Sequence, residues 1–221
     1  VSVASNAQSL NLKNVDNYLN YIEKNNLGVG SVSIFKDGKE VYGKSFGQVA
    51  IKDLKFDNQT KYYIGSVTKM ITATLIFKLI ENGQLKLDDK LADFYPEIPN
   101  SEIITIKNLL EHSSGLGSYV VKNGEVWVTK PIEEKELFNL IVEQGVSFQP
   151  NEDVKYSNSA YYLLAKIVEK KYKTPFHKIF NKEIAQPLKM KNIASVESNP
   201  KNVFLPYIYK NNEWTKLTDE I

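Results

Sequence analysis

The sequence predicts a mixed α/β (α+β) fold in which a sheet-containing region lies beside a mostly helical one. Near the N-terminus, two alternating apolar runs separated by a short polar turn predict a β-hairpin. Through the middle of the chain, several segments carry apolar residues three and four positions apart, which predicts helices. No internal repeat or low-complexity segment occurs, so two neighbouring regions of different secondary structure are the simplest arrangement.

Residues 10–26 carry apolar positions at helical spacing and predict an amphipathic helix. A hairpin follows, because residues 31–35 and 40–46 alternate between apolar and polar side chains with a turn between them. A short strand at residues 62–64 then leads into a helix over residues 66–81. Apolar side chains lie on most sides of that helix, so we expect it to be buried.

The rest of the chain predicts more helices and then a return to strand structure. The expected helices span residues 106–112, 132–144, 159–172 and 175–186, and a late strand carries Trp214. These elements predict three parts: residues 10–75 begin the sheet region and include the start of the 66–81 helix, residues 76–172 form a mostly helical subdomain, and residues 173–221 return to the sheet region.

The composition is that of a globular protein with a substantial core. Of the 221 residues, 42% are apolar and 24% are charged, which is ordinary for soluble domains. All 28 basic residues are lysines, and 26 acidic residues leave a net charge of only +2. Because arginine is the usual reader of guanine edges and phosphates, we expect no nucleic-acid partner.

Metal and thiol chemistry are also disfavoured. Cysteine is absent, which excludes disulfides, thiolate metal sites and a cysteine nucleophile. The two histidines, His112 and His177, are too far apart in sequence for a helical zinc motif. We therefore expect neither a metal nor another cofactor.

The first nine residues are expected to lie outside the fold. The chain starts without methionine in a run of small residues, so residues 1–9 are interpreted as either a signal-peptide remnant or an expression tag. The first interpretation favours export and a periplasmic or secreted bacterial location. No later apolar run has the length of a membrane span, and we expect no stable membrane insertion.

Residues 38–45 match the phosphate-binding loop pattern at every position. That loop has to follow a strand and open a helix whose free N–H groups hold phosphate. Here the match spans the predicted hairpin turn and its return strand. We therefore reject nucleotide binding at this place.

A Ser-x-x-Lys pattern, a candidate for nucleophilic catalysis, occurs three times. Ser33 and Lys36 lie on a predicted strand, where residues three apart point to opposite faces. The match that starts at Ser198 contains a proline, which argues against a regular helix. Only Ser66 and Lys69 open a helix, where residues three apart lie on one face and can touch.

The pair Ser66 and Lys69 has two interpretations, one catalytic and one structural. A lysine that loses hydration at the base of an apolar helix can be neutral and take the serine proton. The free N–H of Ser66 at the helix start can stabilise a developing oxyanion. Alternatively, Ser66 only begins the helix and Lys69 extends to solvent.

A third candidate group is Tyr156, in the run Tyr156-Ser157-Asn158. Tyr-x-Asn also occurs at Tyr18 and Tyr209, but Tyr156 lies in a loop that precedes a helix. A tyrosine beside a lysine can shuttle a proton, and Asn158 can hydrogen-bond a substrate amide. Asn158 can also cap the following helix.

Five motifs together resemble the serine β-lactamase and penicillin-binding protein superfamily, in its class C branch of β-lactamases, DD-peptidases and esterases. Their order and spacing agree with that branch from about residue 10 to about residue 195. The motifs are Tyr-Ile-Gly-Ser-Val-Thr-Lys at 63–69, Leu-Lys-Leu-Asp-Asp at 85–89, Leu-Leu-Glu-His-Ser-Ser-Gly-Leu at 109–116, Tyr-Ser-Asn at 156–158 and Pro-Leu-Lys-Met at 187–190.

The resemblance implies an antiparallel sheet flanked by helices, with the site beside a mostly helical subdomain. It implies Ser66 as the nucleophile, Lys69 and Tyr156 as the proton-transfer pair, and Asn158 as a substrate-amide contact. His112 is expected to belong to a structural loop.

Two departures from the family pattern are visible. Asn151 stands where the family usually has glycine, and asparagine tolerates a positive φ, so we expect the turn to survive. The family's third motif, Lys or His followed by any residue and Gly, does not occur after Tyr156. We therefore expect the C-terminal portion of the family fold to be lacking. Either the chain is a fragment of a longer protein, or the catalytic site is incomplete because the second oxyanion donor is missing.

The resulting expectation is a serine hydrolase that forms an acyl-enzyme on Ser66. Its substrate is a small molecule or a peptidoglycan peptide: a D-alanyl peptide, a β-lactam or a small ester. The alternative is a non-catalytic protein that binds or senses muropeptides or β-lactams, since the third motif is absent.

Overall fold

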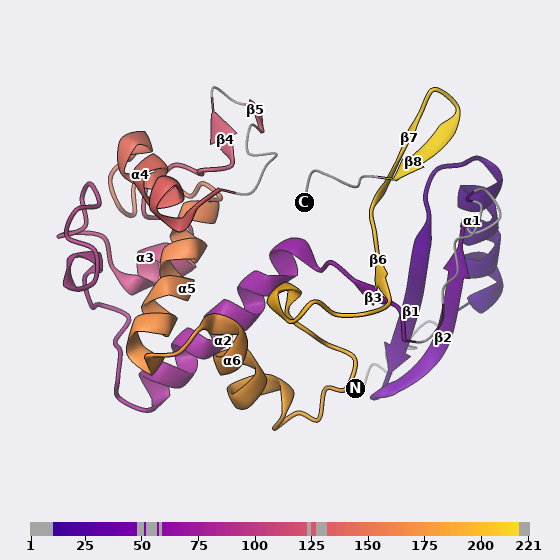
Figure 1. Ribbon diagram of the computed structural model, residues 1–221, viewed down its shortest axis with the longest axis horizontal. Coiled ribbons are helices and arrows are strands. Elements are labelled where there is room, and N and C mark those ends of the chain that lie inside the picture. Colours follow the sequence, from indigo (N-terminus) through magenta and orange to yellow (C-terminus); the bar gives the residue numbers. More distant parts are fainter. Residues whose placement is uncertain are drawn as a thin grey trace, which may run out of the picture. The chain divides into compact units, whose positions relative to one another are not determined.

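The computed structural model describes residues 11–47, 51, 57, 59–122, 125–126 and 132–216. These residues fall into two compact units (Figure 1). The sheet unit takes in the described residues of Val1–Tyr62 and Asn202–Thr218, and the helical unit those of Tyr63–Lys201. The domain boundaries expected at residues 75 and 172 stay a prediction, and the expected leader or tag at residues 1–9 lies outside the described residues.

The sheet unit begins with a helix packed on a hairpin. Helix α1 (Leu12–Lys24) starts at Asn11, whose side chain accepts the N–H of Asn14. Strands β1 (Gly30–Lys36) and β2 (Lys39–Phe46) pair antiparallel. Asp16 on α1 joins the helix to β2, because it accepts hydrogen bonds from Tyr42 and Lys44 of that strand. The predicted helix and hairpin are confirmed.

The remaining strands are short and pair two by two. Strand β3 (Lys61–Tyr62) pairs in parallel with β6 (Val203–Phe204), and β7 (Tyr207–Lys210) pairs antiparallel with β8 (Glu213–Lys216), which contains the predicted strand residue Trp214. In the helical unit, β4 (Val121–Lys122) pairs with β5 (Glu125–Val126). The described residues therefore form two-stranded sheets, three of them antiparallel.

The helical unit contains each helix that the sequence predicts for its residues. A 3-10 turn, η2 (Gly65–Val67), runs directly into α2 (Thr68–Glu81). The others are η3 (Leu91–Asp93), α3 (Ile106–Leu110), α4 (Glu134–Gln144), α5 (Asn158–Tyr172), α6 (Phe176–Phe180), the π-helical turn η4 (Asn181–Ala185) that extends α6, and η5 (Val196–Ser198).

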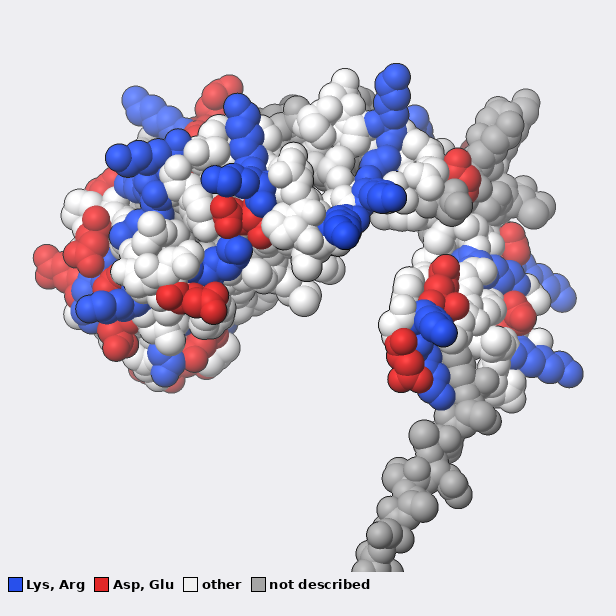
Figure 2. Space-filling model, turned by 90° about the horizontal axis from the view of Figure 1, so that it is seen from below, with Lys and Arg blue, Asp and Glu red and all other residues white. Residues whose placement is uncertain are grey.

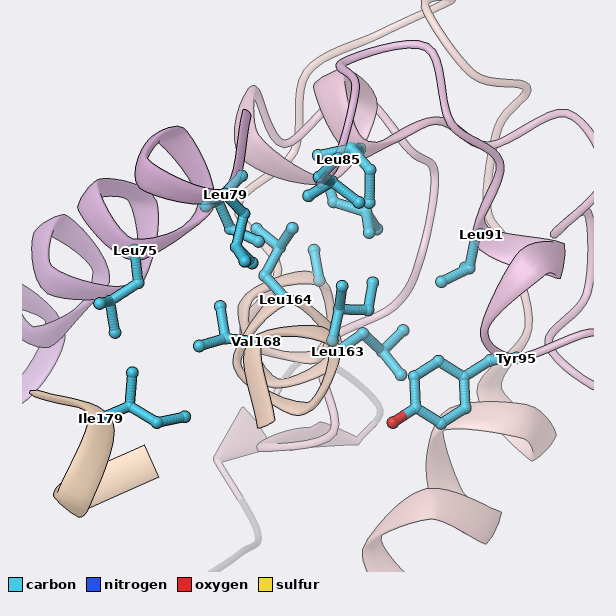
Figure 3. Close-up of a cluster of buried hydrophobic side chains, with 14 of the residues drawn as sticks. Leu75, Leu79, Leu85, Leu91, Tyr95, Leu163, Leu164, Val168 and Ile179 are labelled. Atoms are coloured by element: carbon cyan, nitrogen blue, oxygen red, sulfur yellow. The ribbon is translucent and has the colours of Figure 1, made fainter. Parts of the chain in front are cut away.

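The core of the helical unit lies between α2 and α5 (Figure 3). Leu75 and Leu79 of α2 meet Leu163, Leu164 and Val168 of α5, and all five side chains have no exposed surface. Burying each of these side chains contributes about 1.5–3 kcal/mol to folding. This packing fixes the two helices against each other, and the candidate site lies where both of them begin.

The expectation that α2 is buried on most sides was wrong. Thr72, Leu75, Ile76 and Leu79 are buried, but Val67, Met70 and Phe77 are 56%, 70% and 52% exposed. Apolar composition shows that several faces of a helix could pack. It does not show on which faces a neighbouring element lies.

On the face of the helical unit that is visible in Figure 2, lysine and acidic side chains are interspersed and form no field of one sign. No helix in the described part of the chain is long and apolar enough to cross a membrane.

Candidate active site

Ser66 lies in the 3-10 turn that precedes α2. Gly65 enters this turn with a φ of +50°, a conformation that glycine adopts without steric cost. Ser66 Oγ lies 3.2 Å from Nζ of Lys69, one turn further along. Ser66 is exposed and Lys69 is half-buried. The helical spacing read from the sequence therefore brings the two side chains together.

Tyr156, in the loop just before α5, lies beside Ser66. Its hydroxyl lies 2.6 Å from Ser66 Oγ, and Nζ of Lys69 lies 4.8 Å from the centre of its ring. Burial alone would raise the pKa of Tyr156, but interactions with Lys69 and Ser66 outweigh burial and lower the pKa below the ordinary value of 10.0. A lowered pKa favours proton exchange between this hydroxyl and Ser66.

Asn158 is the first residue of α5, and its side chain turns toward Lys69. Its Oδ1 accepts a hydrogen bond of 2.8 Å from Nζ of Lys69. The cap of α5 is Ser157, whose Oγ accepts the N–H of Ala160. The suggestion that Asn158 caps the helix was therefore wrong. Because Ser157 takes the cap, the amide of Asn158 is available to the site.

Ser118 accepts a hydrogen bond from the amide nitrogen of Asn158. Nδ2 of Asn158 donates to Ser118 Oγ at 3.1 Å, and the backbone N–H of Asn158 donates to the same oxygen at 3.3 Å. With Lys69 on the carbonyl oxygen and Ser118 on the nitrogen, both ends of the Asn158 amide are fixed. Ser118 belongs to none of the predicted motifs, and its place two residues after the Ser-Ser-Gly-Leu run is the local signal for it.

The loop between α3 and Ser118 is held by close backbone contacts. A Cβ built on Gly115 would lie 2.0 Å from the carbonyl oxygen of Phe148, so only glycine fits there. Asn151 has a φ of +69°, as expected, and its N–H donates to the carbonyl of Ser113 at 2.9 Å. Ser157 Oγ donates to the carbonyl of Gly117 at 2.9 Å. The loop thereby fixes the segment around Tyr156 and Asn158.

The competing Ser-x-x-Lys and phosphate-loop matches have different surroundings. Ser33 Oγ donates to Glu40 on the facing strand at 2.6 Å, and Lys36 ends the same strand. Ser198 ends a 3-10 turn and donates to the carbonyl of Ser195. Residues 38–45 form the hairpin turn and β2 rather than the start of a helix.

A separate cavity of about 680 Å³ lies in the helical unit, away from the four predicted site residues. Lys166 in its wall bridges the carboxylates of Glu134 and Glu169. Burial alone would lower the pKa of Lys166, but hydrogen bonds and charge from the two glutamates raise it above the ordinary value of 10.5. Tyr95 and Tyr162 also line the cavity, and burial raises the pKa of each to about 12.

Within the described ranges, no group of three or more His, Cys, Asp or Glu side chains is arranged to hold a metal ion. The side chains gathered at the candidate site supply a hydroxyl, an amine, a phenol and an amide. A serine hydroxyl beside a base is an arrangement that nucleophilic catalysis through a serine ester uses.

Comparison with known proteins identifies relatives of this arrangement. The model of the family described as Beta-lactamase matches residues 16–213. Among curated proteins, the chain is 31% identical to PbpX of Bacillus subtilis (strain 168) over 182 residues, which covers 82% of this chain and 45% of that protein.

Solved structures agree with this match. The octameric penicillin-binding protein homologue from Pyrococcus abyssi superimposes with a TM-score of 0.74 and 29% identity, covering 96% of this chain and 52% of that chain. D-amino acid amidase from Ochrobactrum anthropi SV3 gives a TM-score of 0.73 at 20% identity, covering 94% of this chain and 62% of that chain. The amidase shows similarity of fold alone. The chain thus spans about half the length of the first two relatives.

Proposed function

Because the chain belongs to the Beta-lactamase family, we propose that the protein containing it is a serine hydrolase that forms an acyl-enzyme on Ser66. The observation that carries the proposal is the contact of Ser66 Oγ with two groups able to exchange its proton. Tyr156 Oη lies at 2.6 Å and Lys69 Nζ at 3.2 Å. Both distances allow direct proton transfer.

In the proposed reaction, Ser66 Oγ attacks the carbonyl carbon of an amide or ester, and its proton passes to Lys69 or Tyr156. The carbonyl electrons move to an oxyanion near the N–H of Ser66, which lies in the first turn where N–H groups lack helical partners. When the bond between the carbonyl carbon and the leaving group breaks, its electron pair goes to the nitrogen of the leaving amine or the oxygen of the leaving alcohol. That atom takes up the proton that Lys69 or Tyr156 accepted from Ser66. Water then cleaves the serine ester and restores the hydroxyl.

The different roles proposed for Lys69 and Tyr156 follow from their surroundings. Lys69 contacts the neutral oxygens of Ser66 and Asn158, so neither partner holds its proton as a carboxylate would. The lowered pKa of Tyr156 suits it to pass a proton on to the leaving group. Asn158, fixed by Ser118, offers an amide for hydrogen bonding to the substrate.

The proposed substrates are D-alanyl peptides, β-lactams or small esters. Support comes from the likeness to a penicillin-binding protein homologue and, for the fold, to a D-amino acid amidase. To test the proposal, the protein that contains this chain and its Ser66→Ala variant are assayed for hydrolysis of a penicillin, a D-alanyl-D-alanine peptide and an activated ester. We expect at least one to be hydrolysed by the wild type alone. Equal rates for the two proteins on all three compounds would contradict the proposal.

The second candidate is a non-catalytic protein that binds or senses muropeptides or β-lactams at the same site. It predicts one acyl group or one bound ligand per protein, with no turnover. Multiple turnovers that depend on Ser66 would rule this candidate out.

A further inference from the structure

His112 lies immediately after α3, and its ring packs against Tyr156. The ring centres are 4.7 Å apart, and a second aromatic ring, that of Tyr161 on α5, lies 5.0 Å from the imidazole. His112 has a φ of +58°, a conformation in which histidine, asparagine and aspartate are enriched among non-glycine residues. Its imidazole lies close to both tyrosine rings.

Two hydrogen bonds tie His112 to the backbone on both sides of Tyr156. The carbonyl of His112 accepts the N–H of Lys155 at 3.0 Å. Its Nδ1 accepts the N–H of Ser157 at 3.2 Å. Tyr156 itself is 51% exposed, so packing around its side chain restrains it only in part. One residue thus fixes the chain before and after Tyr156 and also contacts its ring.

The second bond requires an imidazole with no proton on Nδ1, because an N–H cannot donate to another N–H. Burial and, second, the charge of Lys69 lower the pKa of His112. In the described part of the chain, the titratable groups that face the ring are Lys69 from α2, Tyr156 from the loop before α5 and Tyr161 from α5. None of them is a carboxylate that would stabilise the imidazolium, so the ring stays neutral at neutral pH.

We propose that His112 is a positioning residue for the acyl-transfer step, holding residues 155–157 so that the Tyr156 hydroxyl stays against Ser66. This inference rests on the proposed function. It assigns His112 no proton transfer to substrate. Protonation of Nδ1 in acid removes the acceptor for Ser157 and releases this restraint, so acylation of Ser66 is expected to fall in acid as His112 becomes charged.

The test uses a matched pair of variants in the protein that contains this chain. Both His112→Asn and His112→Gly tolerate the positive φ, and both lack the ring. Only asparagine keeps an acceptor at the δ position. The first measurement is the rate at which p-nitrophenyl acetate acylates Ser66, followed from pH 5 to pH 9 by intact mass.

We expect His112→Gly to be acylated about tenfold to a hundredfold more slowly than the wild type, because small misplacements of a reacting group cost rates of this size. His112→Asn should be at least about tenfold faster than His112→Gly, and its profile should lack the additional decline that protonation of His112 causes in the wild type below the ordinary pKa of 6.5. Protonation of Tyr156 slows both proteins alike, so the comparison is the ratio of the wild-type rate to the His112→Asn rate, which should fall in acid. Equal rates for the two variants, or a ratio that does not change with pH, would overturn the proposal.

A second measurement does not depend on activity. Hydrogen exchange of the Ser157 amide, read by NMR, should be about tenfold faster in His112→Gly than in wild type and nearly unchanged in His112→Asn. Unchanged exchange in His112→Gly would also overturn the inference. If the wild type is not acylated at Ser66, the proposed function fails, and exchange at Ser157 still decides whether His112 holds the Tyr156 segment.

Discussion

Two half-buried lysines of the helical unit lie in opposite chemical surroundings. Lys69 lies 3.2 and 2.8 Å from the oxygens of Ser66 and Asn158, and it faces the rings of Tyr156 and Tyr161. Lys166 contacts two carboxylates, those of Glu134 and Glu169. Among the described residues, Lys69 forms no ion pair.

The difference separates a lysine suited to proton transfer from one suited to holding helices together. Carboxylates stabilise an ammonium group and keep it charged, as the raised pKa of Lys166 indicates. Aromatic faces also favour the ammonium form, but by only about 0.5–1 kcal/mol at accessible sites. Lys166 therefore stays charged, whereas among the described residues no carboxylate lies against Lys69. The following predictions test this contrast, in order of decreasing effect on acylation.

Replacing Lys69 should have the largest effect. Lys69→Met removes the amine but keeps an unbranched side chain of similar length. We expect acylation of Ser66 by a penicillin to slow by about 10³-fold, within the range for loss of a positioned base. Rates are measured by intact mass against time. Lys166→Met is the matched control. An equal loss of rate in the control would show that Lys69 has no role in acylation that Lys166 lacks.

Tyr156→Phe should slow acylation by about 10²-fold, because the ring remains but the hydroxyl 2.6 Å from Ser66 is lost. The lowered pKa of Tyr156 gives the sign of the pH effect. The phenolate accepts a proton, so the wild-type rate should rise with pH through a pKa below 10.0. This rise should be absent from the profile of Tyr156→Phe. A variant with the same rise would mean that Tyr156 does not exchange the proton.

Ser118→Ala should have a smaller effect, about threefold to tenfold on acylation, since the side-chain and backbone hydrogen bonds from Asn158 to Ser118 Oγ are lost, each worth about 1 kcal/mol or less. The loss should depend on the substrate. A substrate with an amide next to the reacting carbonyl should suffer more than an activated ester, which has no amide for Asn158 to contact. Equal losses on both would argue against orientation of Asn158 as the role of Ser118.

Lys166→Met should leave acylation within about twofold of the wild type and lower stability instead. Removing the ammonium leaves Glu134 and Glu169 facing each other without a cation. We expect the free energy of unfolding, measured in urea at pH 7, to fall by about 1–2 kcal/mol. An unchanged free energy of unfolding would show that the two ion pairs contribute nothing to the packing of α4 on α5.

Much of the fold follows from local sequence. The spacing of apolar residues placed α1, α2, α4 and α5, and alternation placed the hairpin of β1 and β2. A short strand was expected at residues 62–64, and the structure has β3 at Lys61–Tyr62. Its pairing with the distant strand β6 is not indicated by any local pattern.

The candidate site divides in the same way. Ser66 and Lys69 meet because they are three residues apart on a helical turn, and sequence spacing is enough to predict this. The contact of Tyr156 with Ser66 joins residues 90 apart and depends on how α5 packs on α2. The position of Tyr156 in a loop before a helix made it a candidate, and the family resemblance paired it with Lys69. Ser118 and the Nδ1 acceptor of His112 act on backbone groups 40 and 45 residues away, and neither residue type reveals such a partner.

The capping of α5 is a case that chemistry alone left open. Serine and asparagine are equally good caps, so the outcome depends on the residue at which the helix begins. The helix begins at Asn158 with Ser157 as its cap. That one-residue difference leaves the Asn158 amide facing Lys69.

Acylation of Ser66 with help from Lys69 is tested by peptide mapping with mass spectrometry. The protein that contains this chain is incubated briefly and separately with a penicillin, a D-alanyl-D-alanine peptide and an activated ester. For at least one of these compounds we predict one acyl group per protein, on Ser66, and none on Ser66 over the same time when Lys69 is replaced by methionine. A protein that stays unmodified by all three compounds, or that carries the acyl group on another residue with Ser66 free, would be the opposite result.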